Sequence, residues 1–417
     1  MLRLLLILVG AIVLVQLNDA KPLDQAIVAV VIACVLAFVW SRLSVRNLTI
    51  RRVPVVEHAS VGELFSEQLT LANNSIVPKP WLEVLDFSSL PGHAAGQVVR
   101  VKGNGSVHWT AGSICSHRGQ FHLGPLRVRS GDPFGIFSRT VIAPDTMPVL
   151  VWPVAVPLPS FREPGGLFSG GPQSGWSPFT SPSVAGVRDY VPGDPFNRIA
   201  WSATARTSRL MVKEFEQDPV ADVWVVLDLF EGIQRAATIS GEPAQPHRTA
   251  NDYWLDSTVE YGVALAASIC RTYLERGRAV GFIATCQQPI VLSPDRGTTQ
   301  TARILDNLAV VAANGTQPLE TALRAHEARF NRRVSLVAIS SSLDDGWGEE
   351  LGRLASSGIA TQAVMVQPET FDGAGSSLPL IGAMIASGVP VSTVAYGDRL
   401  EHLSNVDVGG GVLSAAY

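Results

Sequence analysis

The chain has 417 residues, a length that corresponds to two or three folded domains. Its composition, 47% hydrophobic and only 16% charged, favours a membrane-attached protein over a freely soluble one. The 32 basic and 36 acidic residues are spread along the chain, so no basic patch is available for a phosphate backbone and nucleic acid is not expected as a partner.

Two apolar segments open the chain. Residues 4–17 are apolar apart from Gln16, and residues 26–40 carry no charge. They predict two transmembrane helices within residues 1–41, at about 4–17 and 23–40, the second being close to the length that spans the hydrocarbon. The alternative is a cleaved secretory signal, which the single basic residue Arg3 and the lack of a small-x-small cleavage site disfavour.

Basic residues flank this hairpin unevenly. The connection at 18–22 contains one lysine, whereas Arg3 precedes the first segment and four arginines follow the second: Arg42, Arg46, Arg51 and Arg52. The positive-inside rule then places both termini and the bulk of the chain in the cytoplasm. We therefore expect a multi-pass protein of the cell membrane with the lipid bilayer as one partner.

Residues 42–160 show short β-type runs separated by Gly, Pro and Asn, which predict a small antiparallel sandwich. The expected strands are 48–56, 64–71, 81–87, 105–114, 119–128 and 147–156. The segment Asp132-Pro133-Phe134-Gly135 predicts a tight turn, in which the aspartate bonds to its own backbone and the glycine supplies a positive φ.

Residues 161–186 are rich in Gly, Pro and Ser and predict a connector between domains. Within it, one segment is superficially similar to a glycine-rich phosphate-binding loop: Gly170-Gly171-Pro172-Gln173-Ser174-Gly175. The strand before it, the helix after it and the Lys-Ser/Thr pair are missing, so the connector interpretation is preferred.

A dense polar block follows at residues 187–220, called the signature block below. Pro192-Gly193 suits a type II turn, and Asp194-Pro195 suits the N-cap and first position of a short helix. Its polar and aromatic residues are Arg188, Asp189, Tyr190, Gly193, Asp194, Arg198, Trp201, Arg206 and Glu214.

Two interpretations of the signature block stay open. Its arginines could form a recognition surface for carboxylates of a partner. Alternatively, the balanced charges form an internal ion-pair network that docks the block onto the next domain, with Trp201 packed beneath it. Because balanced charge rarely makes a steering field, the structural interpretation is preferred.

This block, read from G-V-R-D-Y-V-P-G-D-P to K-E-F-E, resembles the signature of the domain-of-unknown-function 58 family. The resemblance covers roughly residues 115–340 and is strongest over 186–229. It implies a von Willebrand factor A-like domain after the block. It also implies work alongside a MoxR-type AAA+ ATPase, because members of the family commonly occur with one.

From residue 221 to 417 strand and helix patterns alternate, which predicts an α/β domain with a parallel sheet covered on both faces. The expected strands are 222–229, 279–285, 334–340, 361–366 and 389–395. The expected helices are 257–276, 299–312, 319–330, 347–355 and 378–387. The whole chain is thus expected to be an α/β domain preceded by a sandwich-like domain and a transmembrane hairpin.

The resemblance implies a divalent-metal site where the first strand of this domain ends. The familiar ligands are D-x-S-x-S, a threonine and a later aspartate, all oxygen donors that suit Mg²⁺. Here Asp228 remains, Thr316 is a candidate for the threonine, and Ser340-Ser341-Ser342 stands where the last aspartate is expected. The site is degenerate, so no cofactor is expected and Mg²⁺ is the alternative. Asp228 could instead cap the loop backbone.

No catalytic motif accompanies this set. The sequence contains neither H-E-x-x-H nor G-x-S-x-G, and its four cysteines form no C-x-x-C pair. We therefore expect a non-enzymatic, membrane-anchored cytoplasmic adaptor that works with a MoxR-type AAA+ ATPase. The first alternative is a metal-dependent ligand-binding domain, and a weaker one is a hydrolase whose residues meet only in the fold.

Overall fold

The computed structural model describes residues 13, 21–55, 58–161, 180–191, 199–217, 222–237, 255–332 and 334–405. The chain forms two compact units. Unit 1 comprises Met1–Pro153 with Pro246–Trp254, and unit 2 comprises Val154–Gln245 with Leu255–Tyr417. Each unit is described by itself.

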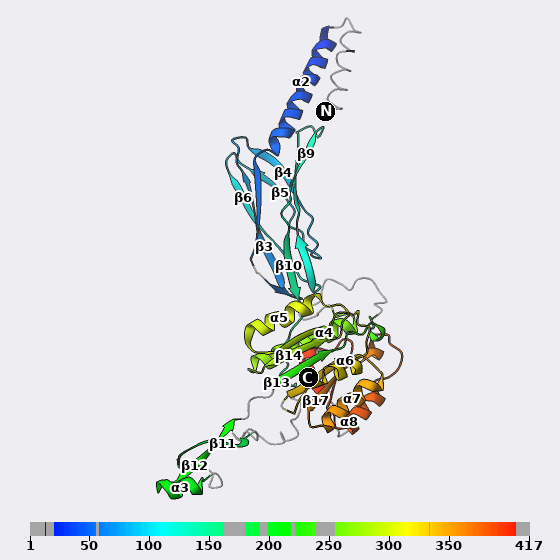
Figure 1. Cartoon of the computed structure of the whole chain (residues 1–417). Helices are drawn as coiled ribbons and strands as arrows, with labels where there is room; N and C mark the ends of the chain where they lie inside the picture. Colours follow the sequence, from blue (N-terminus) through cyan, green and yellow to red (C-terminus); the bar gives the residue numbers. More distant parts are fainter. Residues whose placement is uncertain are drawn as a thin grey trace, which may run out of the picture. The chain divides into compact units, whose positions relative to one another are not determined.

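Unit 1 opens on the long helix α2 (Lys21–Ser44), drawn in dark blue in Figure 1. Within it, Gln25–Ser44 has a mean hydropathy of 2.4 and is long enough to cross a membrane; it is the one such helix in the described part of the chain. The expected second span at 23–40 lies inside α2. The expected first span at 4–17 falls outside the described residues except for Val13, so the hairpin stays a prediction.

The C-terminal end of α2 is fastened to the domain that follows. Lys79 donates from Nζ to the carbonyl oxygen of Leu43, one of the last carbonyls of the helix. A cation at this position also complements the negative end of the helix dipole. Asn47 then takes a left-handed conformation with φ 57°, and strand β1 begins at the next residue.

After α2, the described residues of unit 1 form ten strands in three sheets. Their orders are β1-β3-β6, β2-β10-β7 and β5-β4-β8-β9, and every pairing is antiparallel except β2 with β10. The bounds are β1 Leu48–Pro54, β2 Ala59–Ser60, β3 Leu64–Asn73, β4 Lys79–Asp86, β5 Gln97–Val101, β6 Ser106–Ile114, β7 Gly119–Leu123, β8 Leu126–Gly131, β9 Ser138–Ala143 and β10 Met147–Trp152.

The expected strand at 119–128 was wrong as a single strand. It divides at Gly124, which has φ 85°, and Pro125, which has no N–H to donate to a ladder. The two halves, β7 and β8, belong to different sheets. Strands β5 and β9 were not expected.

A seven-stranded sheet forms the centre of unit 2, in the order β15-β14-β13-β16-β17-β18-β19. Its strands are β13 Asp222–Leu227, β14 Val280–Ala284, β15 Ile290–Asp295, β16 Val334–Ser340, β17 Ala360–Val366, β18 Val391–Val394 and β19 Ser404–Asn405. The expectation of an all-parallel sheet was wrong at its edges, where β15 and β19 run antiparallel to their neighbours. The connection from β14 to β15 is too short for a crossover helix, so the strands form a hairpin.

Helices cover both faces of this sheet. Strand β16 is buried at every residue, and β13 and β17 at all but their first, which requires cover on both sides. Helix α4 packs against α5, and α7 packs against both α6 and α8 (Figure 1). The bounds are α4 Thr258–Glu275, α5 Gly297–Val310, α6 Leu319–Ala325, α7 Asp345–Ser356 and α8 Leu378–Ala386.

The signature block is a hairpin with a short helix. Strand β11 (Thr180–Asp189) pairs with β12 (Met211–Gln217), and α3 (Trp201–Thr207) lies between them in the chain. The start of β11 at Thr180 shortens the expected connector, whose residues 162–179 are outside the described part. The expected start of a short helix at Asp194-Pro195 lies outside the described residues. In the described part, Ile199 forms a β-bridge with Val212 and α3 begins at Trp201.

Candidate functional site

Three strand ends meet around Asp228, directly after β13. The adjacent strand β14 is followed by Thr285, and β16 ends in Ser340. Carboxyl ends of parallel neighbours lie at one edge of a sheet, which is where open α/β sheets place ligands. The buried carboxylate of Asp228 accepts from Ser340 Oγ at 2.6 Å and from Thr285 Oγ1 at 3.3 Å.

Asp228 also organises the loop that follows it. Its Oδ1 accepts from the backbone N–H of Phe230 at 3.1 Å, a bond that turns the chain after the strand. Gln234 donates from Nε2 to the carbonyl oxygens of Asp228 and Phe230. The structure therefore places Asp228 in the loop-capping role, whatever else it does.

Burial raises the pKa of Asp228 to about 6, from a usual value of 3.8. Hydrogen bonds from Ser340, Phe230 and Thr285 favour the charged form and oppose this effect, whereas the negative charge of Glu320 reinforces it. Glu320 lies in the first turn of α6. The site thus holds a carboxylate that favours a proton or a cation.

Thr316 lies in a loop that abuts this edge, although its own side chain is exposed. The neighbouring Gly315 donates to the carbonyl oxygen of Leu229 at 2.9 Å and accepts from the N–H of Glu231 at 3.0 Å. A Cβ on Gly315 would lie 2.0 Å from the carbonyl oxygen of Thr285, so only glycine allows this approach. Within the described residues, no hydrogen bond joins Thr316 to Asp228.

The serine run after β16 stands in place of an acidic ligand. Ser340 Oγ accepts from the N–H of Ser342, whose Oγ in turn accepts from the N–H of Asp344 at 3.1 Å. Ser341 is buried, and its Oγ has no hydrogen-bond partner. Asp344 and Asp345 are exposed at the start of α7. The edge therefore collects hydroxyl and carboxylate oxygens, which are ligands for a hard cation.

The structure describes part of the signature block. Gly193, Asp194 and Arg198 fall outside the described residues. Tyr190 donates its backbone N–H to Leu210, and Glu214 is opposite Gly186 in the β11–β12 ladder. Arg188 donates from Nη1 to the carbonyl oxygen of Asp189 at 3.1 Å, and both residues are exposed.

The expectation that Trp201 packs beneath the block was wrong. Its side chain is 68% exposed at the start of α3, a helix in which no residue is buried. Arg206, in the last turn of the same helix, is also exposed. A seven-residue helix offers too little surface to shield a tryptophan, which explains why the local pattern misled.

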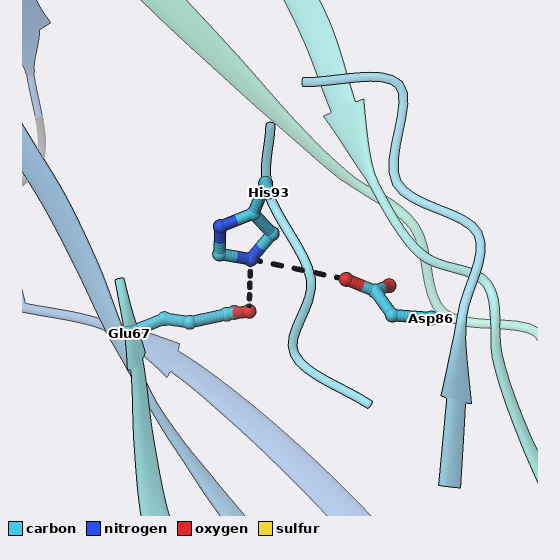
Figure 2. A group of neighbouring side chains, drawn as sticks. All are labelled: Glu67, Asp86 and His93. Atoms are coloured by element: carbon cyan, nitrogen blue, oxygen red, sulfur yellow. Dashed lines mark hydrogen bonds and ion pairs between the residues drawn. The ribbon is translucent and has the colours of Figure 1, made fainter. Parts of the chain in front are cut away.

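Unit 1 contains a buried polar cluster that the sequence analysis did not anticipate (Figure 2). His93 Nε2 lies 2.7 Å from Glu67 Oε1 and 3.8 Å from Asp86 Oδ2, and all three side chains are at most 2% exposed. Ligand atoms of these residues lie within 4.8 Å of one another, a spacing that a metal ion could bridge.

Arg52 closes this cluster. Its Nη2 is 2.8 Å from Asp86 Oδ1, and its Nε is 2.7 Å from Glu67 Oε2, a contact without hydrogen-bond geometry. Burial by itself would raise the pKa of Asp86, but hydrogen bonds from Ser88 and Arg52 hold it below its usual value. Because the guanidinium already compensates the carboxylates, we treat the four residues as an ion-pair network, the sandwich network.

Comparisons with known proteins bear on unit 2. The family model "Protein of unknown function DUF58" matches residues 186–389. The match includes Asp228, Thr316 and the whole signature block at 187–220, and it excludes α2 and the sandwich. The expected DUF58 resemblance is therefore confirmed over this range.

One curated relative of this chain is "Uncharacterized protein YeaD" of Bacillus subtilis (strain 168), 24% identical over 260 residues. The alignment covers 60% of this chain and 57% of the relative, so the chain spans little more than half of the relative's length.

Solved structures show only weak likeness. The CARDB domain of PF1109 from Pyrococcus furiosus is 14% identical, covering 25% of this chain and 94% of that domain, with a TM-score of 0.19. A beta-glucosidase from Listeria innocua is 11% identical, covering 25% of this chain and 16% of the enzyme, with a TM-score of 0.18.

Proposed function

We propose that this DUF58 chain is a membrane-anchored cytoplasmic adaptor that acts through surface contacts, without bond-making chemistry, and has a MoxR-type AAA+ ATPase as its partner. The exposure of Trp201 carries the proposal. Tryptophan and arginine are enriched among residues that dominate protein interfaces, and an exposed tryptophan on a short helix is costly without a partner. The DUF58 match, which spans this helix, supports the choice of ATPase.

Charge around Trp201 fits this role. Arg206, Arg209 and Lys213 are exposed on α3, the turn after it and β12. Among residues 187–191 and 199–213, whose side chains the structure describes, the exposed carboxylate is that of Asp189. Arginine forks suit carboxylates of a partner. We therefore expect the ATPase to present an acidic surface to the signature block.

The anchor and the fold assignment belong to the same proposal. Helix α2 supplies one membrane span, and the apolar segment at 4–17 supplies the second, in the orientation that the flanking arginines favour. The finer fold proposed for unit 2 is von Willebrand factor A-like. The position of Asp228, after a central strand of the sheet, supports it.

Trp201→Ala is expected to weaken binding of the purified, cognate MoxR-type ATPase by at least about tenfold, because central interface aromatics typically contribute more than ~1.4 kcal/mol. The measurement is surface plasmon resonance with the full-length chain in nanodiscs. Leu378→Ala is the control, since Leu378 is 69% exposed on α8 of the same unit. Equal affinity of the wild type and the Trp201 variant, or no binding by either, would contradict the proposal.

The second candidate function is divalent-cation binding at Asp228. The observation that favours it is the cost of keeping this buried carboxylate charged beside Glu320, a cost that a cation would remove. Asp228, Ser340 and Thr285 would supply its oxygen ligands.

Isothermal titration of the full-length chain with Mg²⁺ or Mn²⁺ tests this candidate. If it holds, the wild type gives a saturable heat that Asp228→Ala abolishes and that the exposed-site control Asp256→Ala leaves unchanged. Absence of a saturable heat in the wild type would remove this candidate and leave the adaptor proposal intact.

A further inference from the structure

Two loops of the sandwich that adjoin α2 expose large apolar side chains. Phe134 is 67% and Ile136 is 37% exposed in the loop between β8 and β9, and Ile76 is 84% exposed in the loop between β3 and β4. Single exposed apolar residues are normal on a soluble domain, whereas several of them at one end mark a protein or membrane contact. Exposed apolar residues gathered at the helix end of unit 1 therefore need an explanation.

Contacts place both loops beside the helix. The Phe137 ring lies 5.5 Å from the Phe38 ring in an edge-to-face arrangement, and Phe38 is inside the apolar stretch Gln25–Ser44. On the other loop, Asn74 donates its backbone N–H to the carbonyl oxygen of Asn47, just beyond α2. Both loops thus lie near the level at which the apolar helix ends.

The position of Phe38 in α2 shows at which level of the helix the β8–β9 loop lies. It precedes Ser44, the last residue of α2, by about 9 Å along the helix axis at the usual rise per residue. Arg42 and Arg46 are exposed beyond it, as is typical where a helix passes from hydrocarbon into the headgroup layer. With α2 across a bilayer, Phe134 and Ile136, which lie close to Phe137 in the β8–β9 loop, would be at the boundary between the acyl chains and the headgroups.

Backbone hydrogen bonds of the β8–β9 loop keep Phe134 exposed. The buried Asp132 accepts from the backbone N–H groups of Phe134, at 2.9 Å, and of Phe137. Gly135 takes a positive φ of 69° and donates to the carbonyl oxygen of Asp132. This is the predicted Asp-Pro-Phe-Gly turn, and in it the side chain of Phe134 does not pack into the core of the sandwich.

We infer that these loops are a second membrane contact, in which Phe134, Ile136 and Ile76 enter the interfacial layer of the bilayer. The inference rests on the membrane anchor proposed above. It goes further in assigning a lipid-facing surface to the sandwich itself. Arg139, exposed on β9, and Arg42 would lie in the headgroup layer and favour anionic phospholipid. The contact would hold the sandwich against the membrane surface.

Depth-dependent fluorescence quenching tests this inference. An environment-sensitive fluorophore is attached to Phe134→Cys, Ile136→Cys or Ile76→Cys in full-length chain with Cys286 replaced by serine. The chain is reconstituted in phosphatidylcholine–phosphatidylglycerol vesicles that contain doxyl-labelled lipids. We expect strong quenching at all three positions, greater with shallow than with deep doxyl groups.

Two further positions make the outcome unambiguous. Leu64→Cys is the negative control, because Leu64 is 63% exposed at the opposite end of β3, about 30 Å from Asn73 at the usual strand rise. Val30→Cys, 56% exposed within α2, is the positive control. Quenching at Val30 with none above the Leu64 level at the loops overturns the inference but keeps the anchor. Lack of quenching at Val30 overturns both.

Discussion

Asp228→Asn is expected to stabilise unit 2 at pH 7 by up to about 3 kcal/mol and to flatten its stability between pH 4 and pH 6. The wild-type carboxyl has a pKa raised to about 6 in the folded chain, against 3.8 as its usual value. The folded state therefore binds the proton more tightly than the unfolded state. The contribution of this carboxyl to the free energy of unfolding is fully present below pH ~4 and is lost as the pH rises through ~6.

Asparagine removes this dependence without breaking the site. Its Oδ1 can still accept from the N–H of Phe230 and from Thr285 Oγ1, and its Nδ2 can donate to Ser340 Oγ. The neutral amide has no charge to desolvate, so the cost at neutral pH disappears.

Urea unfolding of the full-length chain in nanodiscs, with chelator and at several pH values, measures this effect. Hydrogen exchange of peptides from β13 and β16 reports unit 2 specifically. Asp256→Asn, at an exposed carboxylate of the same unit, serves as the control. A loss of stability at pH 7 in Asp228→Asn would show that the ionised form is required, as a bound cation would demand.

Arg52→Met is expected to destabilise unit 1 by about 3–5 kcal/mol, since it leaves the buried carboxylates of Glu67 and Asp86 uncompensated. Both carboxylates contact the guanidinium within 2.8 Å, and their side chains are 0% and 2% exposed. Methionine fills a similar volume, so the loss reports charge more than packing. Adding Glu67→Gln should recover part of the loss by removing one of the two buried charges.

Arg129→Met is the matched control for this substitution. Arg129 pairs with Glu83 at 3.8 Å on the surface of the same unit, with its side chain 50% exposed. Exposed pairs contribute at most about 1 kcal/mol. Hydrogen exchange of peptides from β3 and β6 in both variants decides the comparison, and equal protection would contradict a role for the sandwich network in holding the domain together.

Much of unit 2 could be predicted because its strands are buried on both faces. Runs such as Val334–Ser340 are apolar for almost their whole length and alternate with helical patterns, and such a pattern has few structural alternatives. The edge strands β15 and β19 were missed for the opposite reason. Both are short, and β15 is partly exposed. Their antiparallel pairing depends on the connection to the preceding strand, not on a periodic pattern.

The sandwich network was missed because its members are far apart in the sequence. Arg52, Glu67 and Asp86 come from β1, β3 and β4, and His93 lies beyond β4. A signal was nevertheless present in β3, where Phe65, Glu67, Leu69 and Leu71 alternate on one face and all are buried. A glutamate on the inward face of a strand requires buried partners, although the sequence does not say which.

At the Asp228 site the sequence located the aspartate but not its surroundings. Ser340 was recognised only as a replacement for an acidic ligand, yet it forms the shortest hydrogen bond to the carboxylate. Thr285 was not considered, because its proximity arises from the parallel pairing of β14 with β13. Trp201 was expected beneath an internal ion-pair network because the charges of the signature block are balanced. Balanced charge in a sequence does not distinguish an internal network from an exposed surface.

The margins of the seven-stranded sheet limit how this chain can self-associate. On one side, within the described residues, β19 consists of Ser404–Asn405, and on the other β15 ends with Pro294 and Asp295. Short strands, proline and charge at a margin oppose the addition of another strand from a neighbouring molecule. Polymerisation through these margins is thereby discouraged, which would suit the membrane-anchored chain proposed above.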